Sequence, residues 1–403
     1  MANNLSAFTP KYWSKRMQII HEKATVYRAI CSFEERATLN NGDTVARPYR
    51  SALVAQTYTK ATDVSLQDIT ATEETLVVNV AKTVPFYVDD IDKIQNKWDS
   101  ADAWATDAGK KLYQWVDADV LGEYDQAAST VDDADFAGTS GLGITVDVTN
   151  ILQVFTRAGK KLDAQNIDSD NRFAVISPQV KQVLLEYLGG KESALGDSTG
   201  MNGHIGRWNG FELYVSNNLT FSANLNIATQ PTNTDTVVIN GVTFTFVTSI
   251  GSTAGNVLIG ADAAAARTNL IAAINDPATT SSTQVALSAA NQLKLRGMTA
   301  SESGTTVLIK CEGFSYLANG GTTLAETLTA VADIWTTTKQ IQHNLFGRKG
   351  AIDVVIQKEP NVEFRMPPLK LGRNVLPWVL YGLKTFKEGT YALVDVRVRT
   401  DSF

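Results

Sequence analysis

The chain has 403 residues, of which 44% are hydrophobic and 19% are charged. This composition is typical of a folded protein and excludes a disordered or collagen-like chain, and the length exceeds what one hydrophobic core usually supports. The net charge of −6 disfavours a protein that holds nucleic acid by neutralising phosphates, because that interaction needs clustered lysine and arginine. Cys31 and Cys311 are the only cysteines, so we expect no disulfide framework. The sequence also has neither a signal peptide nor an apolar stretch of about 20 residues, and predicts no membrane span.

The first 40 residues are weakly periodic, with scattered apolar side chains, and predict an arm that needs a partner surface. After them, β-branched and aromatic residues recur at 44–58 and 75–88 around a polar stretch. This pattern predicts a long two-stranded hairpin with an extended tip. Because an isolated hairpin is only marginally stable, it too favours contact with a partner.

Three helices are expected in the first half of the chain. The first runs from about Asp92 to about Ala127, with Asp90 or Asp92 as its cap. Its buried stripe consists of apolar residues three and four apart: Trp98, Ala101, Ala105, Ala108, Leu112 and Trp115.

The second helix is expected to begin near Asp147. Its predicted apolar face contains Val148, Ile151, Leu152, Phe155 and Leu162. The third follows a strand at 172–176 and has clearer end signals. Ser177 is the expected N-cap, Pro178 occupies the first helical position, and Gly189 ends the helix. With further strands expected at 211–216, 351–357 and 391–400, the predicted fold class is α+β.

A sharp change in composition interrupts this pattern. From about Ser222 to Trp335 the chain has only four basic residues, and threonine and alanine are abundant. Asn240-Gly241 predicts a tight hairpin, 262–276 predicts an alanine-rich helix, and 284–297 and 305–313 predict two more strands. We interpret this block as an inserted module with its own small core.

The order of elements outside the block, together with three phrases, resembles a known family. The phrases are RFAVISPQVKQVLLEY (172–187), HIGRWNGFELYVSNNL (204–219) and GRKGAIDVVIQKEP (347–360). They are similar to the major capsid proteins of tailed bacteriophages with the Hong Kong 97 type fold, and the resemblance covers about 1–219 and 339–403. It implies a structural, non-enzymatic protein that self-assembles into pentamers and hexamers of an icosahedral head enclosing double-stranded DNA.

The resemblance also implies a division of the chain. The expected parts are an N-terminal arm (1–41), an extended loop (42–88), a peripheral domain with a long spine helix (89–143), an axial domain (144–221), an inserted surface domain (222–335), an axial return (336–369) and a peripheral return (370–403). An arm, a long hairpin and an exposed spine would each bury apolar surface on adjacent subunits.

The implied partners are other copies of the chain, a scaffolding protein during assembly, a portal protein, a decoration protein, and packaged DNA enclosed without sequence-specific binding. The implied location is the virion, assembled in the host bacterial cytoplasm. Capsid-like sequence starts almost at Met1, so we expect uncleaved subunits. Lys60 is the only lysine between Gly42 and Ala81, but no crosslinking partner can be assigned to it. The alternative function is a phage or cell-surface binding or decoration protein that uses the inserted module.

No constellation in the sequence predicts catalysis, and we assign no catalytic, cofactor-binding or metal-binding residue. Gly196 to Gly200 matches G-x-S-x-G with His204 nearby, but Ser198 lacks the strand and helix that a nucleophile elbow needs, so we expect a flexible loop. The other histidines, His21 and His343, are expected at a surface or interface.

Two charged clusters have ordinary interpretations. Asp89, Asp90 and Asp92 lie at a strand-to-helix junction, which favours helix capping over a divalent cation site. The doublets Lys110-Lys111 and Lys160-Lys161 lie on polar helix faces, where solvation or pairing with Asp107 or Asp163 is expected. Weak contact with packaged DNA is the alternative for these lysines.

Overall fold

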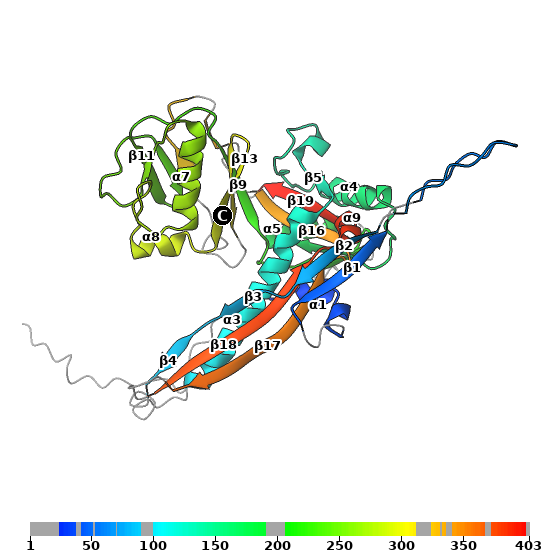
Figure 1. Cartoon of the computed structure of the whole chain (residues 1–403), viewed down its shortest axis with the longest axis horizontal. Helices are drawn as coiled ribbons and strands as arrows, with labels where there is room; N and C mark the ends of the chain where they lie inside the picture. Colours follow the sequence, from blue (N-terminus) through cyan, green and yellow to red (C-terminus); the bar gives the residue numbers. More distant parts are fainter. Residues whose placement is uncertain are drawn as a thin grey trace, which may run out of the picture.

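The computed structural model combines helices with three main sheets and one projecting hairpin (Figure 1). It describes residues 24–37, 42–50, 53–69, 71–89, 100–190, 206–311, 324–330, 333–335, 341–366 and 372–399. Most of the expected N-terminal arm, the cap residues Asp90 and Asp92, His21, and the loop containing Ser198 and His204 lie outside these ranges. The expected α+β class is confirmed.

An elongated sheet carries the longest helix along one face (Figure 1). Its strands are β17 (Asp353–Arg365), β18 (Arg373–Lys384), β3 (Val80–Thr83) and β4 (Phe86–Val88), with β18 in the middle. The helix α3 (Ser100–Gly122) continues into a 3₁₀ turn, η3 (Glu123–Gln126), and confirms the predicted long helix from Ser100 onward. Ala108 and Leu112 are buried as expected.

The predicted hairpin is confirmed in part. Strands β1 (Thr44–Arg50) and β2 (Ala71–Val77) pair antiparallel, and residues 53–69 project from their ends (Figure 1). The expected second strand at 75–88 is wrong beyond β2, because β3 and β4 leave the hairpin and pair with β18. Gly382 permits this crossing: a Cβ there would lie 2.4 Å from the backbone oxygen of Val77.

A nine-stranded sheet forms the centre of the molecule. Its path runs β13-β14-β9-β16-β6-β8-β7, and β19 pairs with β16 and with β5. The strands outside the inserted block are β5 (Ser129–Val131), β6 (Arg172–Ile176), β7 (Arg207–Trp208), β8 (Phe211–Val215), β16 (Ile341–Arg348) and β19 (Leu393–Arg399). Helices α4 (Ile151–Ala164) and α5 (Pro178–Gly189) share a buried apolar cluster with this sheet.

The two helices on this sheet differ in how well their starts were predicted. α5 begins as expected, with the Ser177 hydroxyl accepting a 3.2 Å hydrogen bond from the Val180 amide. α4 begins four residues later than expected, because the Asp147 carboxylate accepts hydrogen bonds from the Thr149 and Asn150 amides and closes a turn first. The predicted apolar face was therefore wrong at Val148 and Leu152, which are exposed. The buried face is Ile151, Val154, Phe155, Ala158 and Leu162.

The inserted block begins with β9 (Phe221–Asn226) and contains a small four-stranded sheet. That sheet has the order β12-β11-β10-β15, with β10 (Thr236–Ile239), β11 (Val242–Val247), β12 (Asn256–Leu258) and β15 (Leu324–Glu326). The predicted turn is confirmed, since Asn240 and Gly241 both have positive φ, at 51° and 66°. Helix α7 (Ala263–Asn275) confirms the predicted alanine-rich helix.

The strand predicted at 284–297 was wrong. Ser288 caps a short helix, α8 (Ala289–Lys294), and the strand β13 (Met298–Ser303) starts only after it. β13 then pairs with β14 (Thr306–Cys311), which confirms the strand expected at 305–313.

The inserted block has its own apolar cluster but not its own set of sheets. Residues from Phe221 to Trp335 form one buried hydrophobic cluster. However, β9 pairs with β16, so β9, β14 and β13 extend the central sheet. The returning segments also differ from the expected division: β17, expected in the axial return, lies in the elongated sheet, and β19, expected in the peripheral return, lies in the central sheet.

Candidate functional site

The hairpin tip is the largest run of exposed apolar side chains in the described part of the chain. Large apolar side chains on 53–69 are at least half exposed: Leu53, Val54, Tyr58, Val64, Leu66 and Ile69, with Leu66 at 96%. The two limbs of the tip are joined by Gln67, whose side-chain amide donates to the Val54 carbonyl and accepts from the Val54 amide. The tip is therefore shaped locally but contributes no core of its own.

The base of the hairpin is fixed to the elongated sheet. Val45, Leu76 and Val78 are buried with Val355 and Phe386 in a small apolar cluster. Beside it, the Arg47 guanidinium lies 2.6 Å from Glu35, 3.2 Å from Asp353 and 2.9 Å from Glu388. Burial raises the pKa of Asp353, and Arg47 opposes that shift. The hairpin thus projects from an anchored base.

A buried carboxylate ties the N-terminal segment to the long helix. Asp117 on α3 accepts hydrogen bonds from the Val26 and Tyr27 amides, at 2.7 and 2.8 Å. Its second oxygen accepts a 2.8 Å bond from the Asn218 side chain. α1 (Tyr27–Ile30) is therefore held against α3 beside the segment between β8 and β9 that leads into the inserted block.

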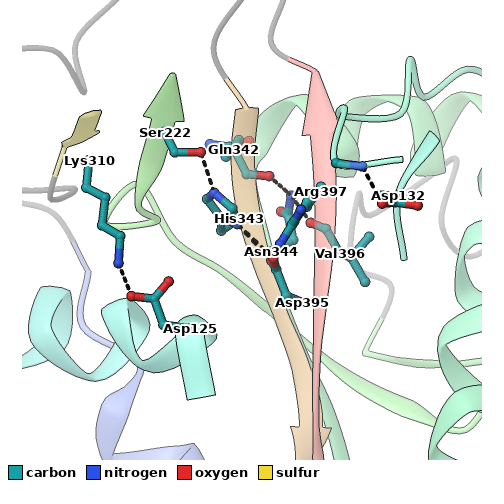
Figure 2. Close-up of polar contacts among 11 residues, drawn as sticks. Asp125, Asp132, Ser222, Lys310, Gln342, His343, Asn344, Asp395, Val396 and Arg397 are labelled. Carbon is teal, nitrogen blue, oxygen red and sulfur yellow. Dashed lines mark hydrogen bonds and ion pairs between the residues drawn. The ribbon is translucent and has the colours of Figure 1, made fainter. Parts of the chain in front are cut away.

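A second polar group joins three strands of the central sheet (Figure 2). The Ser222 hydroxyl on β9 lies 2.8 Å from His343 Nε2 on β16, and His343 Nδ1 lies 2.9 Å from the Asp395 carboxylate on β19. All three residues are buried. The Tyr124 ring, in η3, stacks on the imidazole with 3.7 Å between centroids.

This order of groups is the one found in serine hydrolases, but its setting differs. Ser222 lies within a strand, not on a strand-to-helix turn, and is only 5% exposed. Ser222 and His343 also line a cavity of about 260 Å³, together with residues that include Tyr124, Asn224 and Arg397. Three adjacent strands each contribute one member, so the group acts as a cross-strand tie.

Sequence reasoning missed this group. His343 was expected at a surface or interface, but it is 3% exposed and lies between strands. The G-x-S-x-G motif contains a different serine, Ser198, and the histidine near it is His204; both lie outside the described residues. Only the pairing of distant strands brings Ser222 to His343, and no local motif signals that pairing.

The other predicted residues have ordinary surroundings. Lys110 pairs with Asp107 at 3.3 Å, as expected. Lys161 pairs with Asp135 at 2.6 Å, while Asp163 pairs with Arg172. Lys60 lies exposed on the hairpin tip.

The described residues contain no candidate set of metal ligands and no candidate membrane-spanning helix. Within the described ranges, no three histidine, cysteine or acidic side chains gather as metal ligands. No helix there is long and apolar enough to cross a membrane.

Comparison with known proteins gives structural matches only. No protein-family model matches the chain, and no curated protein matches its sequence. A structure from Mycobacterium phage Che8 matches with a TM-score of 0.56 and 15% identity over 98% of both chains. The capsid structure of cyanophage P-SCSP1u matches with a TM-score of 0.53 and 11% identity over 100% of this chain and 96% of that one.

The capsid asymmetric unit of cyanophage Pam1 matches with a TM-score of 0.51 and 10% identity, over 100% of this chain and 99% of that one. At such low identity the likeness shows the fold, and it does so across nearly the whole chain. The chain has the fold of phage capsid structures, and the resemblance drawn from the sequence is confirmed at that level.

Proposed function

We propose that this chain is a structural major capsid protein. Copies of it assemble into the pentamers and hexamers of an icosahedral phage head that encloses double-stranded DNA. The proposal is supported by the capsid fold over nearly the full chain. The observation that carries it is the hairpin tip, because Leu66 and Ile69 project on a segment that its own subunit does not cover.

The energy of burial explains why such a tip favours assembly. Fully burying a leucine or isoleucine side chain contributes about 1.5–3 kcal/mol. Several such side chains on one extended segment favour contact with a second copy of the chain. In a monomer the same side chains would remain in water at no benefit to folding.

Each part of the chain has a role in this proposal. We assign α3 as the spine helix, residues 42–77 as the extended loop, and β17, β18, β3 and β4 as the peripheral sheet. The strands of the central sheet outside the inserted block, with α4 and α5, become the axial domain, and 222–335, which includes β13, β14 and most of β9, becomes the inserted surface domain. These assignments differ from the division expected from the sequence for five strands, β3, β4, β5, β17 and β19, because strand pairing defines the sheets.

The proposed partners are a scaffolding protein during assembly in the host cytoplasm, a portal protein, a decoration protein and the enclosed DNA. A net charge of −6 favours enclosure of DNA without sequence-specific binding. The proposed role is structural, in the virion, and non-enzymatic. We do not retain the alternative of a surface-binding or decoration protein, because the phage capsid structures that match this chain do so over nearly its whole length.

Co-expression of the full chain with its scaffolding protein tests the proposal. We expect closed, uniform shells in negative-stain electron micrographs. A chain that remains monomeric by sedimentation under the same conditions, although folded by circular dichroism, would contradict it.

A further inference from the structure

The central sheet narrows where the inserted block joins the rest of the chain. β9 pairs with β14 through six residue pairs, and β16 pairs with β19 through seven. Between them, β9 and β16 share only two pairs, Ile341 with Ser222 and Gln342 with Phe221. The His343 amide adds one more bond, 3.0 Å to the Thr220 carbonyl. This junction, which we call the waist, has two ladder pairs, compared with three between β16 and β6 and six between β9 and β14.

Side-chain hydrogen bonds also join the two strands at the waist. The Ser222–His343–Asp395 chain crosses it directly, and the Arg397 side chain donates to Asp395 at 2.9 Å and holds that carboxylate in place. Hydrogen bonds to a charged carboxylate are stronger than neutral ones, and burial excludes competing water.

A second contact reaches the end of the spine helix. Lys310 on β14 forms an ion pair with Asp125 in η3 (Figure 2). The Lys310 ammonium also lies 5.5 Å from the centre of the Tyr124 ring, and that ring stacks on His343. The Tyr124 ring therefore contacts both the Ser222–His343–Asp395 chain and the Lys310–Asp125 ion pair.

We propose that the waist is a hinge, and that the Ser222–His343–Asp395 chain together with the Lys310–Asp125 pair locks the inserted module in one orientation relative to the spine helix. The lock sets the direction in which the module projects from the subunit. The apolar cluster of the inserted block and the two clusters of the main body share no residue, so polar side chains supply the lock, and Tyr124 of the cluster around α3 packs against it.

Three substitutions each remove part of the lock. The hydrogen-bonded chain is broken by Ser222→Ala or His343→Ala, and the ion pair by Lys310→Met. Asn344→Ala is the matched control, because Asn344 is equally buried on the same strand but accepts from the Ser177 amide in the main body. Spin labels at Ala254→Cys and Lys160→Cys, both exposed, report the distance between the two bodies. The labelled full chain carries C31A and C311A.

We expect a narrow distance distribution without lock substitutions and with Asn344→Ala, and a distribution at least twice as broad with Ser222→Ala or His343→Ala. Hydrogen exchange should rise about tenfold in β9 and at the start of β16, and stay unchanged in α7.

Equal breadth of the distance distribution in all variants would overturn the proposal. Faster exchange in α7 would also overturn it, because it would mean that the module itself unfolds. Labelling of Ser222 by a fluorophosphonate would also overturn it, since it would make the group a nucleophilic site.

Discussion

At the scale of single residues, Asp117 is a buried carboxylate that accepts hydrogen bonds from three separate donors. It is fully buried, and it is the hydrogen-bond acceptor for two backbone amides and one side-chain amide from segments far apart in the sequence. A buried donor left without a partner costs about 1–3 kcal/mol. The carboxylate therefore connects the N-terminal segment to α3.

We predict that Asp117→Ala lowers the free energy of unfolding by about 3 kcal/mol or more, because it leaves the buried amides of Val26 and Tyr27 unpaired. Asp107→Ala on the same helix removes only a partly exposed ion pair and should cost about 1 kcal/mol or less. Urea denaturation of the unassembled subunit measures both. Equal effects for the two variants would contradict the role of Asp117.

Asp119 provides a pH-dependent test on the same helix. Burial raises the pKa of its carboxyl group, and a hydrogen bond from the Tyr381 hydroxyl only partly offsets that shift. In the window between the unfolded pKa of about 3.9 and the raised folded pKa, the native state binds more protons than the unfolded state. The contribution of Asp119 to the free energy of unfolding therefore falls as the pH rises through that window.

We predict that Asp119→Asn becomes less destabilising as the pH rises from about 4 to 7, because the amide stays neutral and still accepts from Tyr381. Denaturation of wild type and variant at several pH values gives the difference in unfolding free energy. A difference that is flat or grows with pH would show that the Asp119 carboxyl has no raised pKa.

At the scale of elements, local chemistry was predictable and long-range pairing was not. Ser177 and Pro178 define the start of α5 by themselves, since a cap and a first-turn proline act within one turn. α4 was misplaced because the Asp147 turn competes with the helix, and 284–297 was misread because Ser288 starts a helix inside an alternating pattern. The Ser222 and His343 contact joins residues 121 positions apart, beyond the reach of any local pattern.

The hairpin is the element whose exposed face the proposed function requires. We predict that Leu66→Asp leaves the subunit folded but lowers shell yield at least tenfold, because assembly would bury an unpaired carboxylate. Thr62→Asp adds the same charge at an exposed polar position of the same tip and should assemble nearly as well as wild type. Circular dichroism and sedimentation measure folding and assembly. Normal shells from Leu66→Asp would exclude the tip as a contact surface.

At the scale of the whole molecule, the composition change near Ser222 predicts an inserted block but not how that block is attached. The abundance of threonine and alanine was visible in the sequence, whereas the extension of the central sheet through β9 depends on pairing with Ile341 and Gln342 after the insertion. The boundary therefore falls within a strand shared by both bodies.

We predict that removing residues 222–335 and joining Phe221 to the following segment leaves a folded main body with a lower melting temperature. The buried clusters around α3 and around α4 and α5 contain no residue of the removed block, although β16 loses its partner at Ile341 and His343 loses Ser222. Thermal unfolding should remain cooperative. Complete loss of folded protein would show that the main body cannot fold without the insertion.

The most direct test of the capsid assignment is an electron cryomicroscopy reconstruction of particles assembled from this chain. The proposal predicts a closed icosahedral shell in which the hairpin tip lies on a neighbouring subunit, with Leu66 and Ile69 buried in that contact. A reconstruction in which the tip stays in solvent, or preparations that never contain closed particles, would contradict it.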